Sequence, residues 1–598
     1  MEKSSIVLLR KKMSERGIYV MIIPSNDIHF GEYIPDHYKI REGLSGFDGS
    51  AGTLVVSLDD AALWTDSRYF EQAEQQLAGS GIALMKMKVK GVPGIPEWIA
   101  SLSDQPFKVA VTGSLYSVAD FEALSSELLS RSEGRIALTA VEDFFSEVLE
   151  NRPALVFNEI IAVDGGESIL SKRERLMKPL IDCYGQNPVY FTQLCDEIAW
   201  SLNLRGSDIE FNPVFLSYML VYPEKTVLFA QAECMSEDVL SRLHAASVEV
   251  FPYASVEKVL SEIDSSCVLV CRRSALSYSF YRILEDAGIR LFDDPVTQGR
   301  ISVMKAAKSR FEQEGMICAN LYDGAAWVKF LKYIDDHFSS GLLDEYGVSR
   351  KIMETRKGNH PDYRGESFHP IVAFNSNAAM AHYEPLKDRS AKLSGSGFLL
   401  IDTGAHYVSG TTDVTRTLAF GEVSHEMKLD YTLILKGMID LSMAVFPEGT
   451  RGDQLDFLAR GPICQAGRIY MHGTGHGIGT YLNVHEGPQS IRMEHNPMPL
   501  LEGMVTSNEP AVYVPGKYGI RIEDSILCRR SEFDGFYCFD TINLVPIESR
   551  LIDTPEYMGR YFSVEERTWL REYNERVYRE LSPLLSEEEL SWFRAKYL

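Results

Sequence analysis

The sequence predicts an α/β chain of several domains. In the first half, apolar runs with the alternation of strands are separated by turn-forming residues, and a stretch with helical spacing follows from Met304. At 598 residues the chain exceeds the roughly 100–200 residues that one domain usually holds. Strands and helices that succeed one another along so long a chain are typical of several α/β domains, each with its own core.

The composition is that of a globular protein and excludes several classes. Hydrophobic residues make up 45% and charged residues 24%, and no apolar run approaches the ~20 residues of a membrane span. The 84 acidic and 60 basic residues give a net charge of −24, which repels phosphate backbones. We therefore expect no membrane and no nucleic acid as a partner. The nine cysteines form no CxxC pair, which favours reduced thiols.

The first domain is predicted to comprise residues 1–152. The opening MEKSSIVLLRKKMSERG has basic residues on both sides of only four apolar ones, whereas a secretion signal needs ~7–15. We therefore interpret it as the first helix of a cytoplasmic protein. Further along, TLVVSLDDAALWTDSRYF predicts a strand, a turn and a strand. A helix is expected to end just before Pro153, where the chain should pass to the next domain.

The second domain is predicted over residues 153–302 and the third over residues 303–598. The second is again α/β in character, with a hairpin signal at Pro223-Glu224-Lys225. The third opens with the helix from Met304, in which apolar residues return every three or four positions. After Val545 the sequence is helical again, so we expect a helical extension over about residues 546–598.

Two aspartates in the third domain are predicted to lie close together. The segment GFLLIDTGAHYVSGTTDVTRTLAF predicts a buried strand, a loop and a second strand. A turn near Tyr407 and Val408 would make Asp402 and Asp413 cross-strand neighbours, with Cβ atoms ~5 Å apart. Asp402 ends an apolar run, where an ionised carboxylate is costly unless a cation joins it. Taken alone, the pair could instead be one turn residue and one solvated residue.

The segment YMHGTGHGIGTYLNVHEGP holds two histidines four residues apart. On a helix His472 and His476 would share one face, but the glycines between and after them disfavour a helix by ~1 kcal/mol each. The glutamate of a helical HExxH zinc site is also absent. Glycine here allows the backbone to pass close to a ligand and frees one imidazole to point inward. The alternative for His476 is a hydrogen-bonded core histidine.

Two glutamates in the same domain are predicted to face the core. Glu509 lies in the apolar stretch MVTSNEPAVYV and Glu523 in YGIRIEDSILC, and both are expected within strands. In the second segment Ile520 and Ile522 would face one way and Arg521 and Glu523 the other. For Glu523 beside Arg521, an ion pair on the surface of an edge strand is the alternative.

Together these residues suit a pair of metal ions. One imidazole and four carboxylates, several able to bridge, match what two divalent ions ~3.5–4 Å apart require. The predicted ligands are Asp402, Asp413, His476, Glu509 and Glu523. Oxygen-rich ligation favours hard ions such as Mn²⁺, with Zn²⁺ or Co²⁺ as alternatives. Such a pair can hold a bridging hydroxide and polarise a peptide carbonyl, so the predicted chemistry is metal-assisted hydrolysis.

The order and spacing of these ligands resemble the pita-bread metallopeptidases. The likeness rests on the two aspartates, on His476 in HGTGHGIG, and on the glutamates in NEP and GIRIED. The segments PSNDIHFGEY, SGFDGSAGT, LWTDSRYFEQA and DEIAWSLNLRGSDIEFNPVF are similar to the N-terminal domains of three-domain aminopeptidase P, so the resemblance covers nearly the whole chain. It implies two creatinase-like N-terminal α/β domains followed by a C-terminal pita-bread catalytic domain, an α/β (α+β) class.

The resemblance also implies an activity. We expect a metallo-aminopeptidase that hydrolyses the N-terminal Xaa-Pro bond of peptides, in the cytoplasm and as a homodimer. The helical extension would help to form the dimer, and its alternative is a cap packed on its own domain. A prolidase limited to dipeptides and a catalytically inactive binding module of the same fold are the alternative functions. A methionine aminopeptidase is disfavoured because nearly half of the chain precedes the catalytic domain.

Further site residues follow from the resemblance alone. His382 in MAHYEP and His485 in NVHEGP match histidines that bind the substrate and steady the scissile carbonyl. His472 and Arg521 match one wall of the pocket for proline. Glu509 matches the group that carries a proton to the leaving nitrogen, so the expected catalytic residues are His382, His485 and Glu509. These roles rest on analogy.

Overall fold

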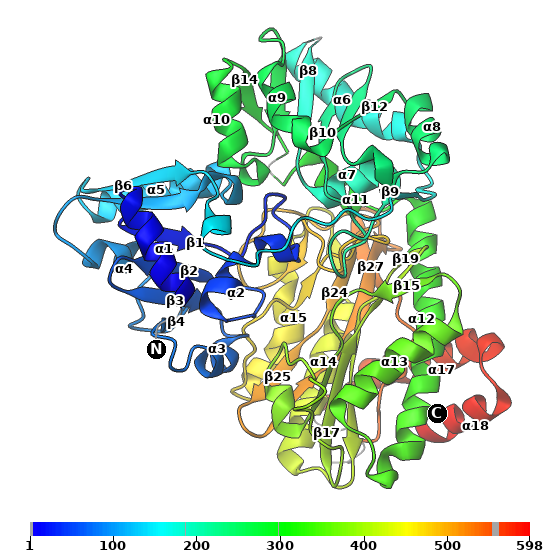
Figure 1. Ribbon diagram of the computed structural model, residues 1–598. Helices are drawn as coiled ribbons and strands as arrows, with labels where there is room; N and C mark the ends of the chain where they lie inside the picture. The colour runs from blue at the N-terminus through cyan, green and yellow to red at the C-terminus, as the bar shows by residue number, and fades with distance from the viewer. Residues whose placement is uncertain (1–3, 186, 297, 553–560) are drawn as a thin grey trace. The chain divides into compact units, whose positions relative to one another are not determined.

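The computed structural model describes residues 4–185, 187–296, 298–552 and 561–598 (Figure 1). The chain forms two compact units, Met1–Ile301 and Ser302–Leu598. None of the described helices is both long and apolar enough to cross a membrane. All of the predicted site residues belong to the second unit.

The first unit contains two six-stranded sheets of the same topology. Their orders are β4-β3-β2-β1-β5-β6 and β12-β11-β10-β8-β13-β14. In each sheet one strand, β2 or β10, is antiparallel to both neighbours, and all other pairs are parallel. No short repeat in the sequence signals this duplication. The strands are β1 (Val20–Ile23), β2 (Thr53–Ser57), β3 (Ala61–Thr65), β4 (Ala83–Lys86), β5 (Phe107–Thr112), β6 (Ile136–Val141), β8 (Pro188–Thr192), β10 (Tyr218–Val221), β11 (Thr226–Phe229), β12 (Val248–Phe251), β13 (Val268–Cys271) and β14 (Arg290–Asp293).

Most elements predicted for this unit are present. The pairs β2–β3 and β10–β11 are the two hairpins expected from the sequence. The predicted first helix is present as α1, although its residues 1–3 lie outside the described ones. The helices are α1 (Ser4–Glu15), α2 (Ile40–Ser45), α3 (Phe70–Gln76), α4 (Ile95–Ser101), α5 (Val118–Arg131), α6 (Ile169–Tyr184), α7 (Cys195–Ser201), α8 (Glu237–Ala245), α9 (Val256–Ser261) and α10 (Tyr278–Asp286).

The helix predicted just before Pro153 is wrong. Only the 3-10 turn η3 (Phe145–Glu147) lies there. Asp143 accounts for the difference, because its side chain accepts a hydrogen bond from the Phe145 amide (2.9 Å) and starts a turn.

The second unit combines short antiparallel sheets with long helices. Its sheets include β16-β17-β20, β15-β18-β19 and β21-β28-β27-β24. The strands are β15 (Tyr363–Glu366), β16 (Ile371–Phe374), β17 (Gly397–Thr403), β18 (Ala405–Tyr407), β19 (Gly410–Thr411), β20 (Val414–Phe420), β21 (Val445–Pro447), β22 (Gly475–His476), β23 (Ser490–Ile491), β24 (Val505–Asn508), β25 (Ala511–Val514), β26 (Tyr518–Arg521), β27 (Asp524–Arg530) and β28 (Phe536–Thr541). The helices are α11 (Arg300–Ala306), which begins in the first unit, α12 (Arg310–His337), α13 (Glu345–Asn359), α14 (His425–Ser442), α15 (Gly452–Gln465), α17 (Val564–Leu581) and α18 (Glu587–Tyr597).

The single helix predicted from Met304 is in fact two helices. α11 ends at Ala306, and α12 begins after Ser309. The Ser309 side chain accepts a hydrogen bond from the Glu312 amide, and the Glu312 carboxylate accepts one from the Ser309 amide. This capping box starts a new helix where hydrophobic spacing alone predicts a continuous one.

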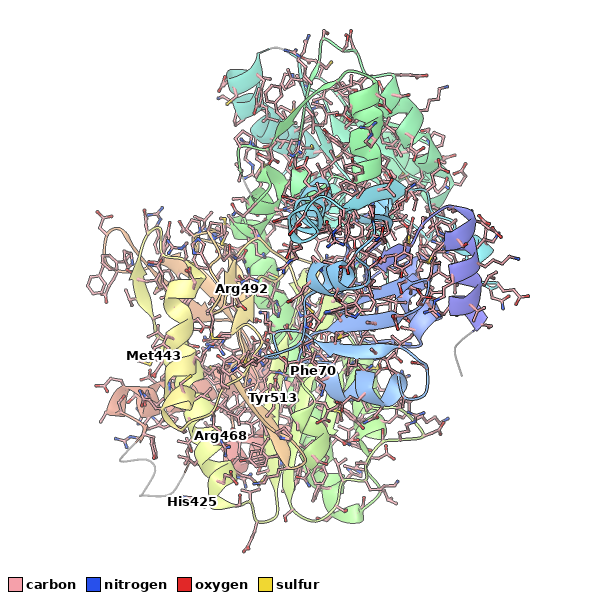
Figure 2. All side chains as sticks on the ribbon, turned by 90° about the vertical axis from the view of Figure 1, so that its left-hand side faces the viewer. Phe70, His425, Met443, Arg468, Arg492 and Tyr513 are labelled. Carbon is pink, nitrogen blue, oxygen red and sulfur yellow. The ribbon has the colours of Figure 1, made fainter. Side chains whose placement is uncertain are left out.

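The core of the second unit supports the strands that carry the predicted site. Figure 2 shows α14 running from His425, its first residue, to Met443, just past its end. The buried face of α14 belongs to the same hydrophobic cluster as Ile520 and Ile522. Since successive side chains of an extended chain point to opposite faces, the intervening Arg521 and the following Glu523 face away from this cluster, as the sequence predicts.

Candidate metal centre

The two aspartates lie on a hairpin whose turn is one residue later than predicted. β17 pairs with β20 so that Asp402 lies opposite Thr415, and the chain turns at Val408-Ser409. A turn displaced by one residue shifts each cross-strand pair by two, so Asp413 is a diagonal neighbour of Asp402. The predicted direct pairing is therefore wrong. A shift of two nevertheless keeps both side chains on the same face.

The two glutamates lie between strands and not within them. Glu509 follows β24, and Glu523 lies between β26 and β27. The Glu523 side chain is buried, which excludes the surface ion pair considered as its alternative. Its backbone amide donates to the Thr415 carbonyl (3.1 Å), and the Thr415 hydroxyl donates to its carboxylate (2.7 Å). Thr415 therefore fixes Glu523 against the hairpin that carries the aspartates.

His476 is placed by a close approach of two backbones. Residues 466–474 are not helical, so the two histidines do not share a helix face. A Cβ at Gly475 would lie 1.9 Å from the Ser507 carbonyl oxygen, so only glycine permits this packing. The glycines were predicted to let the backbone pass close to a ligand. At Gly475 the backbone instead passes close to strand β24. The Ser507 hydroxyl accepts a hydrogen bond from the His476 amide (3.0 Å) and donates to Glu509 (3.3 Å).

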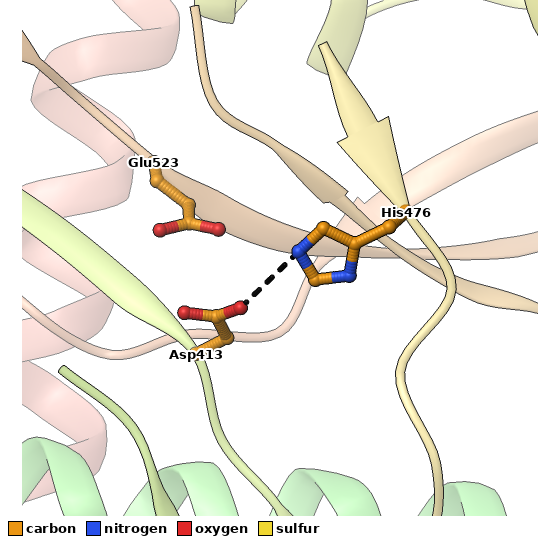
Figure 3. A group of neighbouring side chains, drawn as sticks. All are labelled: Asp413, His476 and Glu523. Atoms are coloured by element: carbon orange, nitrogen blue, oxygen red, sulfur yellow. Dashed lines mark ion pairs between the residues drawn. The ribbon is translucent and has the colours of Figure 1, made fainter. Parts of the chain in front are cut away.

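The imidazole of His476 faces the carboxylates. Its Nδ1 lies 3.0 Å from the Gly477 carbonyl oxygen, which only accepts, so Nδ1 carries the proton. Nε2 lies 3.5 Å from Asp413 and 3.4 Å from Glu509. Asp413, His476 and Glu523 each offer a ligand atom within 4.8 Å of the others (Figure 3). Nε2 thus lies beside two carboxylate oxygens, where it can share a cation with them.

Burial and mutual repulsion disturb these carboxyl groups. Burial, then the charges of Asp402 and Glu509, raises the pKa of Asp413 well above its ordinary value. Burial and the charge of Asp413 raise the pKa of Glu523 in the same way. Burial raises the pKa of Glu509 to about 7, although Arg521 opposes the shift. The site is thus too rich in negative charge for its single guanidinium.

The donor atoms fit divalent ions. Two buried carboxylate oxygens, Asp402 Oδ1 and Glu523 Oε1, accept no hydrogen bond from any described residue. An orphaned buried oxygen is costly unless a cation binds it. Four carboxylates and one imidazole form an oxygen-rich set, which suits hard or borderline ions and not a thiolate-type zinc site.

A chain of hydrogen bonds leads away from Asp402 along one wall. Arg521 pairs with Asp402 Oδ2 (2.5 Å), which leaves Oδ1 for another partner. Arg521 also donates to the Tyr513 hydroxyl (2.5 Å), which lies 2.9 Å from His472 Nε2. Because the Gly473 carbonyl lies 2.7 Å from His472 Nδ1, that nitrogen carries the proton and Nε2 accepts from Tyr513. His472 and Arg521, predicted as one wall, are thus joined through Tyr513.

The remaining two predicted histidines, His485 and His382, lie on different loops. The ring of His485 packs edge-on against that of His476, with centroids 4.3 Å apart. His382 follows the 3-10 turn η8 (Asn375–Ala379). The carbonyl of its neighbour Ala381 accepts a hydrogen bond from Arg521 (3.4 Å), which brings this loop to the same wall.

The residues that the sequence did not predict include Ser507 and Thr415, which bond to the predicted ligands, and Tyr513, which joins His472 to Arg521. Ser507 could have been found, because it lies two positions before Glu509 and alternate strand residues share a face. Tyr513 becomes a diagonal neighbour of Arg521 only once the β25–β26 pairing is known. Thr415 likewise required the register of β17 and β20.

Helix α17, in the predicted helical extension, reaches the segment that carries Glu523. Arg416 donates to the Glu523 carbonyl (2.6 Å) and to the Asp524 carboxylate (2.8 Å). Tyr573 of α17 donates to the same carboxylate (3.2 Å) and to the Val545 carbonyl (3.0 Å). All of these side chains are buried, so α17 completes the wall behind Glu523.

We expect Tyr573→Phe to lower the free energy of unfolding by about 1–3 kcal/mol, because buried acceptors lose a donor. Urea denaturation followed by intrinsic fluorescence measures the change. Tyr578→Phe is the matched control, since Tyr578 is half-buried on the same helix and packs its ring against Phe593. Equal midpoints for the two variants would contradict a role for the Tyr573 hydroxyl.

Known families match almost the whole chain. Residues 314–530 match metallopeptidase family M24, and residues 535–597 match the C-terminal region of peptidase M24. Residues 6–146 and 151–312 each match a creatinase/prolidase N-terminal domain. These matches confirm the predicted fold class, with creatinase-like α/β domains preceding a pita-bread domain.

Individual relatives match over their full length. A probable Xaa-Pro aminopeptidase P of Fusarium vanettenii is 38% identical, over 96% of this chain and 95% of its own. The Metarhizium robertsii protein of the same name is 35% identical, over 98% and 96%. The crystal structure of an X-prolyl aminopeptidase from Caenorhabditis elegans, described as a cytosolic enzyme with a di-nuclear active site, has a TM-score of 0.91 and 30% identity over 99% of both chains. The chain therefore belongs to metallopeptidase family M24, in the group of the Xaa-Pro aminopeptidase P enzymes.

Proposed function

We propose that the protein is a metallo-aminopeptidase that hydrolyses the bond before a proline at the second position of a peptide. The observation that carries the proposal is the convergence of Asp413, His476 and Glu523 in a chain of the M24 family. The curated relatives and the worm structure support the preference for proline, because they are named for it.

The proposed metal ligands are Asp402, Asp413, His476, Glu509 and Glu523. Four carboxylates face one guanidinium, so a single divalent ion leaves negative charge unbalanced, and a second ion offsets it. The worm enzyme, described as di-nuclear, supports two ions. We propose Mn²⁺ from the oxygen-rich set, with Zn²⁺ or Co²⁺ as alternatives. Bound divalent ions would supply Lewis acidity and activate water for hydrolysis.

The residues of the chain then handle protons and orientation. Glu509, held by the Ser507 hydroxyl, takes the proton of the attacking water and returns it to the leaving nitrogen. His485 and His382 donate hydrogen bonds to the substrate carbonyl and to the oxyanion that forms from it. The N–H of an imidazole ring can serve as such a donor.

The wall formed by His472, Tyr513 and Arg521 is proposed to receive the proline. Each side chain is held by its neighbour, so the wall is rigid before the substrate arrives. A rigid wall favours the fixed ring of proline over a flexible side chain. Arg521 also fixes Asp402, which links the proline side of the site to the metal side.

Three further predictions remain proposals. We propose domains at residues 1–152, 153–302 and 303–598, with the two sheets of the first unit in separate domains. We propose a homodimer that the extension over about residues 546–598 helps to form, although residues 553–560 lie outside the described ones. We also propose a cytoplasmic location, which the cytosolic worm enzyme supports.

Steady-state rates on matched peptides test the activity. We expect hydrolysis of Xaa-Pro-Xaa and longer peptides in the presence of Mn²⁺, and at least ~100-fold slower hydrolysis of Xaa-Ala-Xaa. The same series with Zn²⁺ and Co²⁺ compares the metals.

Cleavage of Xaa-Pro dipeptides but not of Xaa-Pro-Xaa would instead identify a prolidase. Measuring the metal content of the protein distinguishes an active enzyme from the catalytically inactive alternative. A protein that binds no divalent ion after Mn²⁺ supplementation would be a binding module that has kept the fold without the catalysis.

A further inference from the structure

Arg356 on α13 is completely buried. Its exposed fraction is 0%, which is rare for a residue that is always charged. It binds Asp323 of α12 through two parallel hydrogen bonds, Nε to Oδ1 (2.7 Å) and Nη2 to Oδ2 (3.1 Å). It also pairs with Glu366 of β15. We call these three residues the Arg356 cluster.

The Arg356 cluster forms hydrogen bonds with the two residues that immediately follow Asp402. Arg356 Nη1 donates to the Thr403 hydroxyl (2.7 Å) and to the Gly404 carbonyl (3.1 Å). Nη2 donates to the Thr403 carbonyl (3.3 Å), and the Thr403 hydroxyl donates to Glu366 (3.0 Å). The N–H groups of a guanidinium are fixed in one plane, so these hydrogen bonds are directional. They restrict the backbone position of the two residues that follow Asp402.

The Arg356 cluster also forms hydrogen bonds with the chain immediately before Asp413. The Thr412 hydroxyl donates to Asp323 Oδ2 (2.9 Å) and accepts from the Ala405 amide (3.0 Å). The Tyr407 hydroxyl donates to Asp323 Oδ1 (3.2 Å). Both ends of the loop between the two aspartates, and its middle, are therefore bonded to one buried group.

This loop needs such a support because the antiparallel pairing is interrupted beside Asp413. The β17–β20 ladder ends before Asp413, and pairing resumes after it, where the Thr412 amide donates to the Ala405 carbonyl (2.8 Å) and β18 pairs with β19. The last paired residues of the ladder are Thr403 and Val414. Beyond them, the Asp413 carbonyl is held by Ser525 (3.2 Å) and Asn543 (3.0 Å), but its side chain depends on where Thr412 lies. The spacing of the two aspartate carboxylates is thus set partly by the ladder and partly by the Arg356 cluster.

We propose that the Arg356 cluster is a positioning device that fixes the spacing of Asp402 and Asp413 for the metal ions, an inference that rests on the proposed function. A buried ion cluster contributes little to stability compared with apolar residues of the same size, because desolvation offsets its attraction. Its use is to select one geometry. Here the selected geometry is that of the loop between two metal ligands.

The test measures metal binding and not only activity. Thr412→Val removes the bond to Asp323 and the bond from the Ala405 amide while keeping the shape of the side chain. Arg356→Lys keeps the charge but loses the forked hydrogen-bonding geometry of the guanidinium. Thr432→Val is the matched control, because Thr432 is equally buried in the second unit and its hydroxyl donates within α14, to the Lys428 carbonyl (2.7 Å). Mn²⁺ affinity is measured by calorimetry and ligand geometry by the visible spectrum of bound Co²⁺.

We expect both cluster variants to bind Mn²⁺ roughly tenfold more weakly, the size of effect typical of outer-shell partners, and to shift the Co²⁺ spectrum. Thr432→Val should match the wild type in both. Wild-type affinity and spectrum in Thr412→Val would overturn the inference, even if Arg356→Lys fails to fold. A wild-type protein that binds none of these ions would instead overturn the proposed function.

Discussion

Asp413→Ala is expected to abolish hydrolysis of Xaa-Pro peptides and the binding of at least one metal ion. Asp413 is buried and lies 3.5 Å from Nε2 of His476, a proposed ligand, so the variant removes one of the proposed donors from the site. The affinity loss should exceed the roughly 10–100-fold that removing an outer-shell partner costs. Metal content after dialysis and kcat at saturating Mn²⁺ measure the two effects.

The same variant should leave the metal-free protein at least as stable as the wild type. Burial and the charges of Asp402 and Glu509 raise the pKa of Asp413 above its unfolded value of ~4. A carboxyl whose pKa rises on folding destabilises the folded state at higher pH, so its removal costs no stability at pH 7. Mn²⁺ should then raise the unfolding temperature of the wild type more than that of the variant.

Asp540→Ala controls for the loss of a carboxylate, because Asp540 of β28 is only half-buried and pairs with Arg529 of β27 (2.6 Å). It should retain wild-type activity and metal content. A fully active Asp413→Ala protein would exclude the two-metal mechanism.

Glu509→Gln is expected to lower kcat by on the order of 10²–10⁴-fold, the usual contribution of a general acid–base group, with little change in KM. The amide keeps the shape of the side chain and one oxygen able to ligate, but it cannot take up a proton. The Ser507 hydroxyl still has an oxygen to which it can donate. Initial rates on Xaa-Pro-Xaa peptides, with metal content measured in parallel, give both quantities.

Glu502→Gln is the matched control, since Glu502 is exposed seven positions earlier and pairs with Arg530 (2.9 Å). Exposed pairs of this kind contribute ~0–1 kcal/mol, so its kcat should equal that of the wild type. If the loss in Glu509→Gln is restored by excess Mn²⁺, Glu509 serves as a ligand and not as the proton carrier.

The parts of the centre that the sequence could predict depend on short-range patterns. The strand–turn–strand around Asp402 and Asp413 and the glycines around His476 are local signals, and the structure has both features. The exact cross-strand pairing was missed because moving the turn by one residue leaves the same side chains on the buried face. The pattern of apolar residues therefore does not distinguish the two turns. Only the two-residue turn at Val408-Ser409 selects the register.

The buried polar residues that hold the ligand segments in place could not be predicted from the sequence. Arg356 and Tyr573 meet the ligand segments through contacts between residues far apart in the chain. Periodicity identifies which face of an element is buried, but it does not identify the buried polar partner on another element. A buried arginine on α13 therefore reads as an ordinary exposed helix residue until the packing of α12, α13 and β15 is known.

The contact of Tyr573 with Asp524 also bears on the order in which the protein is made. During synthesis domains generally fold from the N-terminal end onward. Every proposed ligand precedes α17 in the chain, so a nascent polypeptide holds the full ligand set before it holds Tyr573. A product of premature termination within α17 is thus expected to carry all five ligands and yet leave the wall behind Glu523 open. We expect the quality-control machinery of the cell to treat such a fragment as incompletely folded, even though it contains every proposed ligand.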